Sequence, residues 1–248
     1  MMGACTRNSS KTYYVLAEKL FDEKKYDAAV KEFNKVVNDN PNTKLGEQAL
    51  YRIAVIQYLY TNEYDKAIYS FETYRKISTD KDLEFSAAKS VADIYFSKLE
   101  TYARSAEVYK ELIKKYPKKE SDIFLFKLAK SKFYTLKFDE AISSFEELIK
   151  SYPQSNLVKE SELQIANIYF TKGFYEDAIE NYLKVINKNK NTNYEVLAKF
   201  GLANSLAEMD DIDGAFKIYK QIVNTYPSKN VIELKMKKIR ERKILKGM

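Results

Sequence analysis

The chemically reactive side chains of this chain are few in kind. Its 248 residues include one cysteine, Cys5, and no histidine. Histidine is the usual general base and zinc ligand, and a single cysteine forms neither an intrachain disulfide nor a metal-binding cluster. Carboxylates are plentiful, but they fall on predicted helix surfaces, and no phosphate-loop, dinucleotide-binding or nucleophile-elbow motif is found. The sequence therefore predicts a protein that is not an enzyme and uses no cofactor or metal.

The composition indicates a folded helical protein. Hydrophobic residues make up 45% of the chain and charged residues 31%, whereas Gly (6) and Pro (4) are scarce. All-β folds need many turn residues, so this scarcity favours helices joined by short turns. No run reaches the roughly 18 apolar residues of a membrane-spanning helix.

The positions of small and aliphatic residues repeat along the chain. An aliphatic residue followed by alanine recurs every 37 or 38 residues, and this is the strongest organising signal in the sequence. The six pairs are Leu16-Ala17, Ile53-Ala54, Val91-Ala92, Leu128-Ala129, Ile165-Ala166 and Leu202-Ala203. A second series with the same period places a small residue four positions before an aromatic one: Ala29, Ala67, Ser105, Ala141, Ala178 and Ala215 before Phe33, Phe71, Tyr109, Phe145, Tyr182 and Tyr219.

Residues four positions apart lie on one face of a helix, so each small residue lets a neighbouring helix approach while the ring fills the adjacent space. All four prolines follow a predicted second helix, where proline ends a helix at little cost. The pattern predicts an all-α solenoid of six helix-turn-helix repeats over residues 11–227. Residues 1–10 are predicted as a polar tether and residues 228–248 as a basic capping helix. The second and third repeats carry one extra residue between their helices.

These repeats resemble the tetratricopeptide repeat (TPR). The stretches "YYVLAEKLFDEKKYDAAVKEFNKVVNDNP" and "LQIANIYFTKGFYEDAIENYLKVI" carry its pattern of Leu-Ala, an aromatic residue, then Ala and an aromatic residue, with Pro closing the first stretch. The resemblance implies a superhelix whose first helices line a concave groove that binds peptides or proteins. Carried over by register, the groove residues expected here are Tyr14, Tyr51, Phe126, Lys130, Asn167, Phe200 and Asn204.

Two interpretations of this groove stay open from the sequence. In one, its rings grip a peptide while Asn167 and Asn204 bond to the peptide backbone. In the other, many of the rings pack on the next repeat, as aromatic stripes at helical spacing usually do. The ladder of Phe21, Tyr58, Phe96, Phe133 and Phe170 is assigned mainly to packing.

The net charge of +7 is concentrated in the tail. Residues 228–248 hold eight Lys or Arg and two Asp or Glu, so they contribute +6 and leave the rest of the chain nearly neutral. Ile232, Met236 and Ile239 form one narrow apolar stripe, which indicates a helix that caps the last repeat. The alternative is a surface for anionic partners. Nucleic acid is not an expected partner, because only six of the 42 basic residues are arginine and the body offers no basic track.

The stretch "MGAC" at Met2–Cys5 resembles the end of a bacterial lipoprotein signal, in which small residues precede the cysteine that is lipidated. The basic and apolar parts of such a signal are not in this sequence, so the signal would lie upstream or have been trimmed. The repeat style is similar to that of outer-membrane-associated TPR lipoproteins, such as those of the β-barrel assembly machine and the Tol-Pal system. The expectation is a scaffold of the bacterial cell envelope, on the periplasmic side of the outer membrane, anchored by lipid on Cys5. The alternative is a cytoplasmic TPR adaptor.

Overall fold

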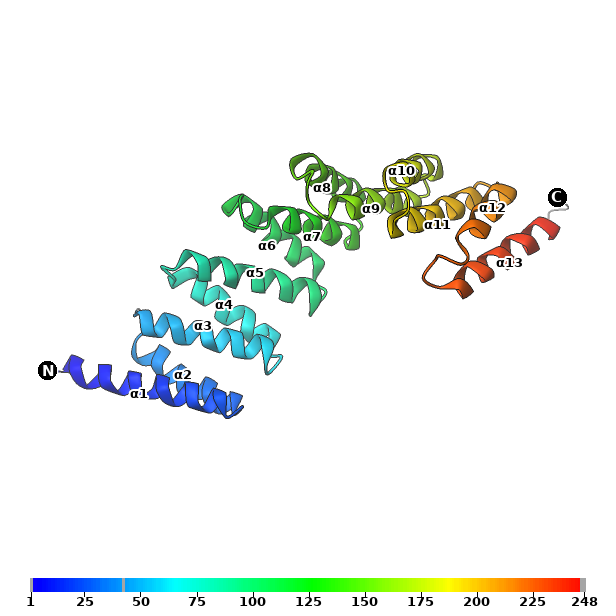
Figure 1. Ribbon diagram of the computed structural model, residues 1–248. Coiled ribbons are helices and arrows are strands. Elements are labelled where there is room, and N and C mark those ends of the chain that lie inside the picture. Colours follow the sequence, from blue (N-terminus) through cyan, green and yellow to red (C-terminus); the bar gives the residue numbers. More distant parts are fainter. Residues whose placement is uncertain (1, 42, 246–248) are drawn as a thin grey trace. The chain divides into compact units, whose positions relative to one another are not determined.

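The computed structural model describes residues 2–41 and 43–245, with side chains from Ser9 onward. In this part of the chain the backbone forms thirteen α-helices and no β-strand (Figure 1). The helices are α1 (Met2–Asp22), α2 (Tyr26–Asp39), α3 (Lys44–Leu59), α4 (Tyr64–Ile77), α5 (Lys81–Ser97), α6 (Tyr102–Lys115), α7 (Ser121–Tyr134), α8 (Phe138–Ser151), α9 (Val158–Thr171), α10 (Tyr175–Lys188), α11 (Asn193–Glu208), α12 (Ile212–Ile222) and α13 (Lys229–Leu245). The predicted all-α repeat fold is confirmed.

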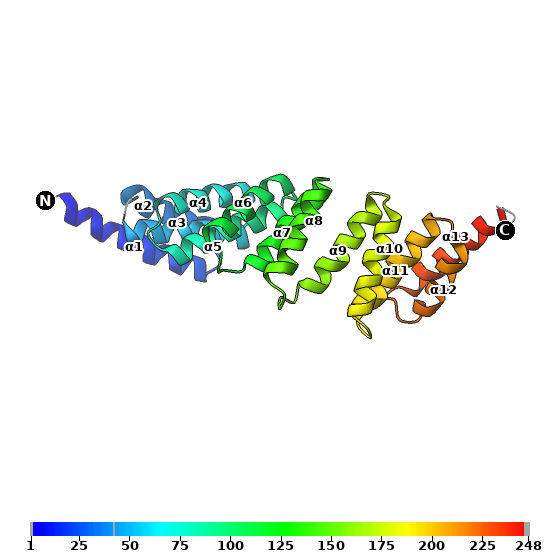
Figure 2. The ribbon, with the colours of Figure 1, turned by 90° about the horizontal axis from the view of Figure 1, so that it is seen from above.

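The chain divides into two compact units, residues 1–121 and residues 122–248. The first unit holds three helix pairs, α1/α2, α3/α4 and α5/α6. Within it, α1, α3 and α5 form one row and α2, α4 and α6 form a second row behind them (Figure 2). The second unit holds α7/α8, α9/α10 and α11/α12, followed by α13. Each predicted repeat is therefore one helix pair.

The predicted small-then-aromatic pairs form the core of each unit. Ala67 on α4 is completely buried, and Phe71, one turn later, is 1% exposed within a cluster that also contains Ala54 and Val91. The second unit repeats this arrangement with Ala178 and Tyr182 on α10. The alanine lets two helices approach and the ring fills the space beside it, so each buried ring contributes about 1.5–3 kcal/mol of apolar burial.

Every turn between the two helices of a repeat contains a residue in the left-handed region. These residues have φ between +50° and +78°, and they are Lys24, Asn62, Glu100, Leu136, Gly173 and Asp210. Such a residue lets the following N–H return to a carbonyl of the last helical turn, and this bond closes the end of the first helix. Four residues separate α3 from α4 and α5 from α6, whereas three separate α1 from α2. The extra residue predicted in the second and third repeats is confirmed.

The described part of the chain begins and ends in a helix. Residues 2–10 were predicted as a polar tether, but their backbone forms the first turns of α1. Ser10 is buried, and its hydroxyl accepts a hydrogen bond from the side chain of Asn40, which follows α2. At the other end, the predicted stripe of α13 packs on α11 and α12. Ile232 is completely buried and Ile239 is 6% exposed, in one cluster with Tyr219.

The left-handed turn residues yield a prediction about stability. Gly173 has φ of +78°, and a methyl group added to it would meet nothing within 4 Å. Gly173→Ala should therefore lower the free energy of unfolding by about 1 kcal/mol through backbone strain alone. Leu136 has φ of +61° and is 73% exposed, so Leu136→Gly should raise the free energy of unfolding at the equivalent turn. Urea denaturation followed by circular dichroism measures both, and shifts in the same direction would contradict this account.

Candidate functional site

The residues predicted to line a groove fall into two sets, one in each unit. Tyr14 and Tyr51 lie on α1 and α3 of the first unit. The second unit holds the others on its own first helices: Phe126 and Lys130 on α7, Asn167 on α9, and Phe200 and Asn204 on α11. Each set lies on helices that stand first in their repeats, as the register predicted.

Both tyrosines of the first set are half-buried. The Tyr14 ring meets Phe33 of α2 edge-on at 5.2 Å between centroids. The Tyr51 ring lies 5.9 Å from Phe71 and 5.1 Å from Tyr74, both on α4. Burial raises the pKa of the Tyr51 hydroxyl, and burial followed by the Glu18 charge raises the pKa of Tyr14. Each ring thus joins a first helix to its own second helix and leaves part of its surface open to a partner.

An apolar strip follows one face of α3 and is called the α3 strip below. It consists of Tyr51, Val55, Tyr58 and Leu59, which are spaced i, i+4, i+7 and i+8. The first three pack partly on the core of the first unit and stay partly exposed, whereas Leu59 is 58% exposed. From the sequence, Tyr58 was expected to pack in the core, and neither Val55 nor Leu59 was among the expected groove residues. The spacing that puts both on the same helical face as Tyr51 could have identified them.

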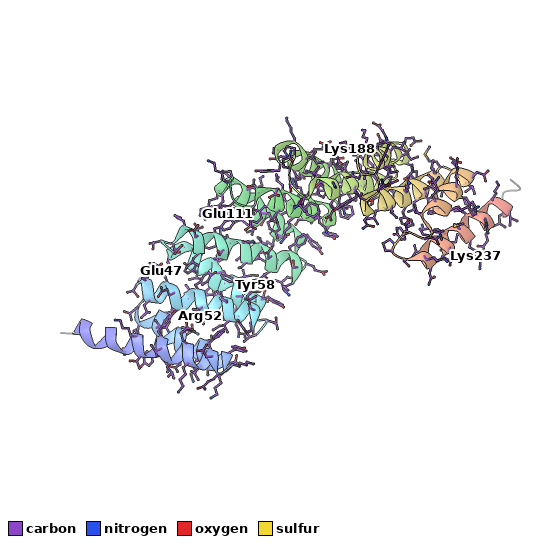
Figure 3. The ribbon with its side chains drawn as sticks, viewed as in Figure 1. Glu47, Arg52, Tyr58, Glu111, Lys188 and Lys237 are labelled. Atoms are coloured by element: carbon purple, nitrogen blue, oxygen red, sulfur yellow. The ribbon has the colours of Figure 1, made fainter. Side chains whose placement is uncertain are left out.

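An ion pair lies next to the α3 strip, between α3 and α1. Arg52 lies between α3 and α1, where Nε and Nη2 donate to the two Glu18 oxygens at 2.8 and 2.5 Å (Figure 3). The same guanidinium stands 4.4 Å from the centre of the Phe21 ring. The strip is therefore an apolar surface with fixed charges beside it, an arrangement that protein-binding surfaces share.

In the second unit, the aromatic members of the predicted set serve mainly in packing. Phe126 is 8% exposed and its ring lies 5.5 Å from Phe145 of α8. The Phe200 ring lies 4.6 Å from that of Tyr226. Lys130 is more accessible, with Nζ 5.7 Å from the Phe126 ring and 6.0 Å from the ring of Tyr134, which is 45% exposed. Phe126 thus belongs to the core, and Lys130 is the accessible member of α7.

Both predicted asparagines are engaged within their own repeats. The Tyr182 hydroxyl donates to Asn167 Oδ1 at 2.8 Å, and the Tyr219 hydroxyl donates to Asn204 Oδ1 at 2.7 Å. Both tyrosines are buried, and burial raises the pKa of each hydroxyl. A buried hydroxyl needs a partner, and the asparagine supplies it. Each Oδ1 is therefore used inside its repeat, and Asn167 Nδ2 also donates to Gln164 Oε1 at 3.5 Å. Contact of these amides with a bound peptide stays a prediction.

The same pairing separates the six repeats into two kinds. In the third repeat, the Tyr109 hydroxyl donates to Asp93 Oδ1 at 2.9 Å, so each repeat with tyrosine at this position has Asn or Asp facing it. The other three repeats have phenylalanine there, and the facing residues are Glu18, Val55 and Lys130. Wherever the second helix has tyrosine at this position, the facing residue on the first helix is therefore one that accepts a hydrogen bond from the tyrosine hydroxyl.

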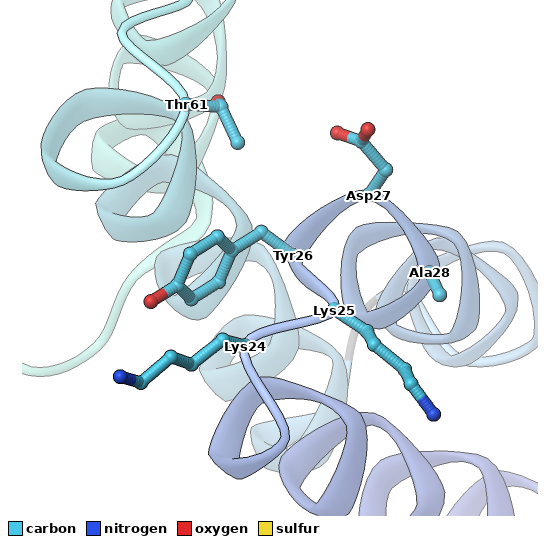
Figure 4. A pocket seen from close by; sticks show the side chains of 6 residues that line it. All are labelled: Lys24, Lys25, Tyr26, Asp27, Ala28 and Thr61. Carbon is cyan, nitrogen blue, oxygen red and sulfur yellow. The ribbon is translucent and has the colours of Figure 1, made fainter.

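A shallow hollow of about 370 Å³ lies at the turn edge of the first unit (Figure 4). Lys24, Lys25, Tyr26, Asp27, Ala28 and Thr61 line it. The Tyr26 ring also lies 4.8 Å from that of Tyr60, and Lys25 pairs with Glu23 at 2.8 Å. The lining holds no pairing of a nucleophile with a base. Among the described residues, no group of His, Cys, Asp and Glu could hold a metal ion.

Cys5 lies in the helical backbone of α1, but its side chain is outside the described residues, so the predicted lipid attachment there is not tested. No helix in the described part of the chain is both long and apolar enough to cross a membrane.

Stacked helix pairs that expose a row of side chains on their first helices define a helical-repeat scaffold. A family model described as a tetratricopeptide repeat-like domain matches residues 100–235, and a tetratricopeptide repeat model matches residues 48–77. The chain belongs to the tetratricopeptide repeat family. The family predicted from the sequence is thereby confirmed.

Several known proteins are similar to this chain. Tetratricopeptide repeat protein 29 of Homo sapiens is 26% identical over 173 residues, which cover 68% of this chain and 30% of that protein. A tetratricopeptide repeat protein of Parabacteroides merdae has a TM-score of 0.60 at 14% identity, covering 95% of this chain and 88% of its own. YrrB, a TPR protein with an unusual peptide-binding site, has a TM-score of 0.57 at 13% identity, covering 83% of this chain and 97% of its own. At these identities the two structural likenesses show the fold alone.

The tyrosine–asparagine pair yields a second prediction. Asn167→Val should lower the free energy of unfolding by about 1–3 kcal/mol, because it leaves the buried Tyr182 hydroxyl without a partner. Adding Tyr182→Phe should recover most of that loss, since the second repeat already combines Val55 with Phe71. Urea denaturation of the two variants measures this recovery.

A matched control is Lys130→Val, which changes the same register position opposite Phe145 and should shift the free energy of unfolding by less than about 0.5 kcal/mol. A double variant that is no more stable than Asn167→Val would contradict the pairing.

Proposed function

We propose that this protein is a non-enzymatic scaffold that binds partner proteins or peptides on the exposed faces of its first helices. TPR proteins in general act as protein-interaction scaffolds and bind other proteins or peptides. For this chain, the observation that carries the proposal is the α3 strip. It is an apolar face whose most exposed member, Leu59, is 58% exposed while its neighbours stay anchored in the core.

The chemistry of the strip fits a protein partner. Tyr51 and Tyr58 combine a packed ring with a hydroxyl, and such amphipathic residues are enriched at the centres of interfaces. Arg52 and Glu18 hold each other in place, so the charged border needs little reordering when a partner binds. The partner expected on the strip is a segment that brings apolar side chains to α3 and polar groups to its borders.

The second unit offers a second and more polar contact. Lys130 Nζ lies near the Phe126 and Tyr134 rings, with no carboxylate in ion-pair distance among the residues described. The Asn204 amide keeps its N–H₂ group for donation, and Asn167 keeps one N–H beside the one that it donates to Gln164. These groups suit the carbonyl oxygens and carboxylates of a peptide. They are proposed as contacts that fix the position of a peptide, with Phe200 beside them as an apolar neighbour.

A binding experiment tests the α3 strip. Peptides are selected from a displayed library against the full chain, and the affinity of one selected peptide is then measured by fluorescence anisotropy. Leu59→Lys should weaken binding by about tenfold, because one well-placed apolar contact is worth about 1–2 kcal/mol at an interface. The fold should be unaffected, since the Leu59 side chain is mostly in solvent.

The matched control is Tyr69→Lys on α4, which replaces a side chain that is 74% exposed in the other row of helices. It should leave the affinity unchanged. Selected peptides that bind Leu59→Lys as tightly as the unchanged protein would refute a site on the α3 strip.

We also propose that the scaffold is a lipoprotein of the bacterial cell envelope, anchored through Cys5. The support is the sequence "MGAC" followed by the polar run "TRNSS". Cleavage before Cys5 would remove residues 2–4 from the start of α1 and leave the repeats intact. The alternative is a cytoplasmic adaptor with the same binding faces.

Metabolic labelling distinguishes the two. Expressed in its own host with its upstream DNA, the protein should incorporate labelled palmitate and sediment with membranes, and Cys5→Ser should abolish both because the acceptor thiol is gone. Thr6→Ser serves as the control and should change neither. A protein that carries no label, or the same label after Cys5→Ser, would favour the cytoplasmic adaptor.

A further inference from the structure

The basic residues of α13 divide into two groups with different surroundings. Residues 229–245 contain seven Lys or Arg and two Asp or Glu. Arg242 donates to the Ala207 carbonyl at 2.8 Å and pairs with Asp210, and Lys243 donates to Asp213 at 2.6 Å. These bonds tie the end of α13 to the turn between α11 and α12. The two cations therefore serve the attachment of the cap.

Arg240 belongs to the other group. Its guanidinium stands 4.5 Å from the centre of the Phe216 ring of α12, and no carboxylate of the described residues lies within ion-pair distance of it. Stacking on a ring keeps the planar fork in one orientation, so its N–H donors are available for a carboxylate at a low entropic cost. Lys235 and Lys238 likewise have no ion-pair partner in the described part of α13 or its neighbours.

Two hollows adjoin Arg240. One, of about 230 Å³, is lined by Ile212, Asp213, Phe216, Arg240 and Lys243. The other, of about 270 Å³, is lined by Glu233, Met236, Lys237, Arg240, Glu241 and Ile244. Both volumes are below the roughly 300–1,000 Å³ of typical small-molecule sites. They match single side chains better than a free metabolite.

The second hollow combines apolar surface with positive charge. Ile244 is 77% exposed beside the partly buried Met236, and Leu245 next to it is 87% exposed. Of the two carboxylates there, Glu241 already pairs with Lys237 at 3.9 Å, and Glu233 pairs with Lys229 at 3.6 Å. The surface therefore offers an aliphatic contact and an unpaired guanidinium side by side.

We propose that α13 and α12 form a docking surface for an acidic protein segment that carries aliphatic side chains. A carboxylate of the partner binds the Arg240 guanidinium through paired N–H donors, and an aliphatic side chain next to it enters the hollow between Met236 and Ile244. The excess of five positive charges in residues 229–245 attracts such a segment from solution. This surface is separate from the α3 strip and adds a second partner to the proposed scaffold.

The test uses the full chain and a fluorescent peptide of three Glu-Leu-Leu-Glu-Ala repeats, with anisotropy as the readout at about 50 mM salt, where screening is weak. Arg240→Gln should weaken binding about tenfold through the loss of a charge-assisted hydrogen-bonded pair. Ile244→Ser should also weaken it. The matched control is Lys238→Gln, which removes the same charge from an exposed side chain of α13 that lines neither hollow, and it should change the affinity by less than about twofold.

Two altered peptides and one variant test the specificity of this surface, and vesicles test the class of partner. A peptide with lysine in place of glutamate, and one with serine in place of leucine, should both bind weakly. Leu59→Lys should leave the affinity for the acidic peptide unchanged. Equal binding by Arg240→Gln and the unchanged protein overturns the proposal. Sedimentation with vesicles of phosphatidylcholine and phosphatidylglycerol that depends on Arg240, without peptide binding, overturns it in favour of a lipid surface.

Discussion

The close approach of two helices at one small side chain is the constraint on which each repeat depends. Ala67 is fully buried where α4 meets its neighbours, and this allows the Phe71 ring to enter the core one turn later. That ring in turn lies 5.9 Å from Tyr51 and 6.5 Å from Tyr58. The exposed α3 strip is therefore positioned by a buried contact on the second helix, and the proposed binding face and the core are parts of one packing arrangement.

The basic tail shows how local context assigns different roles to like charges. As a composition, residues 228–248 predicted either a cap or a surface for anions. The structure shows the cap, because Arg242 and Lys243 bind Asp210 and Asp213, whereas the Arg240 guanidinium stands over the Phe216 ring and is the cation assigned to the proposed docking surface. Arg240 and Lys243 even line the same hollow, so what separates their roles is the neighbour that each one contacts. Charge counts alone do not distinguish them.

The repeat architecture could be predicted from the sequence because small and aromatic residues recur with one period, and even the extra turn residue before Tyr64 showed in the spacing. The groove was harder to predict, since a register position says which helix face a residue occupies and not what already contacts it. Phe126 is buried by Phe145, and Asn167 is engaged by Tyr182. The contact between Asn167 and Tyr182 could have been predicted from the sequence, because in every repeat Asn or Asp accompanies tyrosine and not phenylalanine.

That pairing also limits which single substitutions the surface of the first helices tolerates. In a repeat with tyrosine, a substitution at Asn167 or Asn204 leaves a buried tyrosine hydroxyl without its acceptor. The tyrosine must then also change to phenylalanine before the first-helix position tolerates other residues. In a repeat with phenylalanine no such coupling exists, and the three residues found there, Glu18, Val55 and Lys130, are acidic, apolar and basic. A single substitution at this position should therefore cost the fold less in the first, second and fourth repeats than in the third, fifth and sixth.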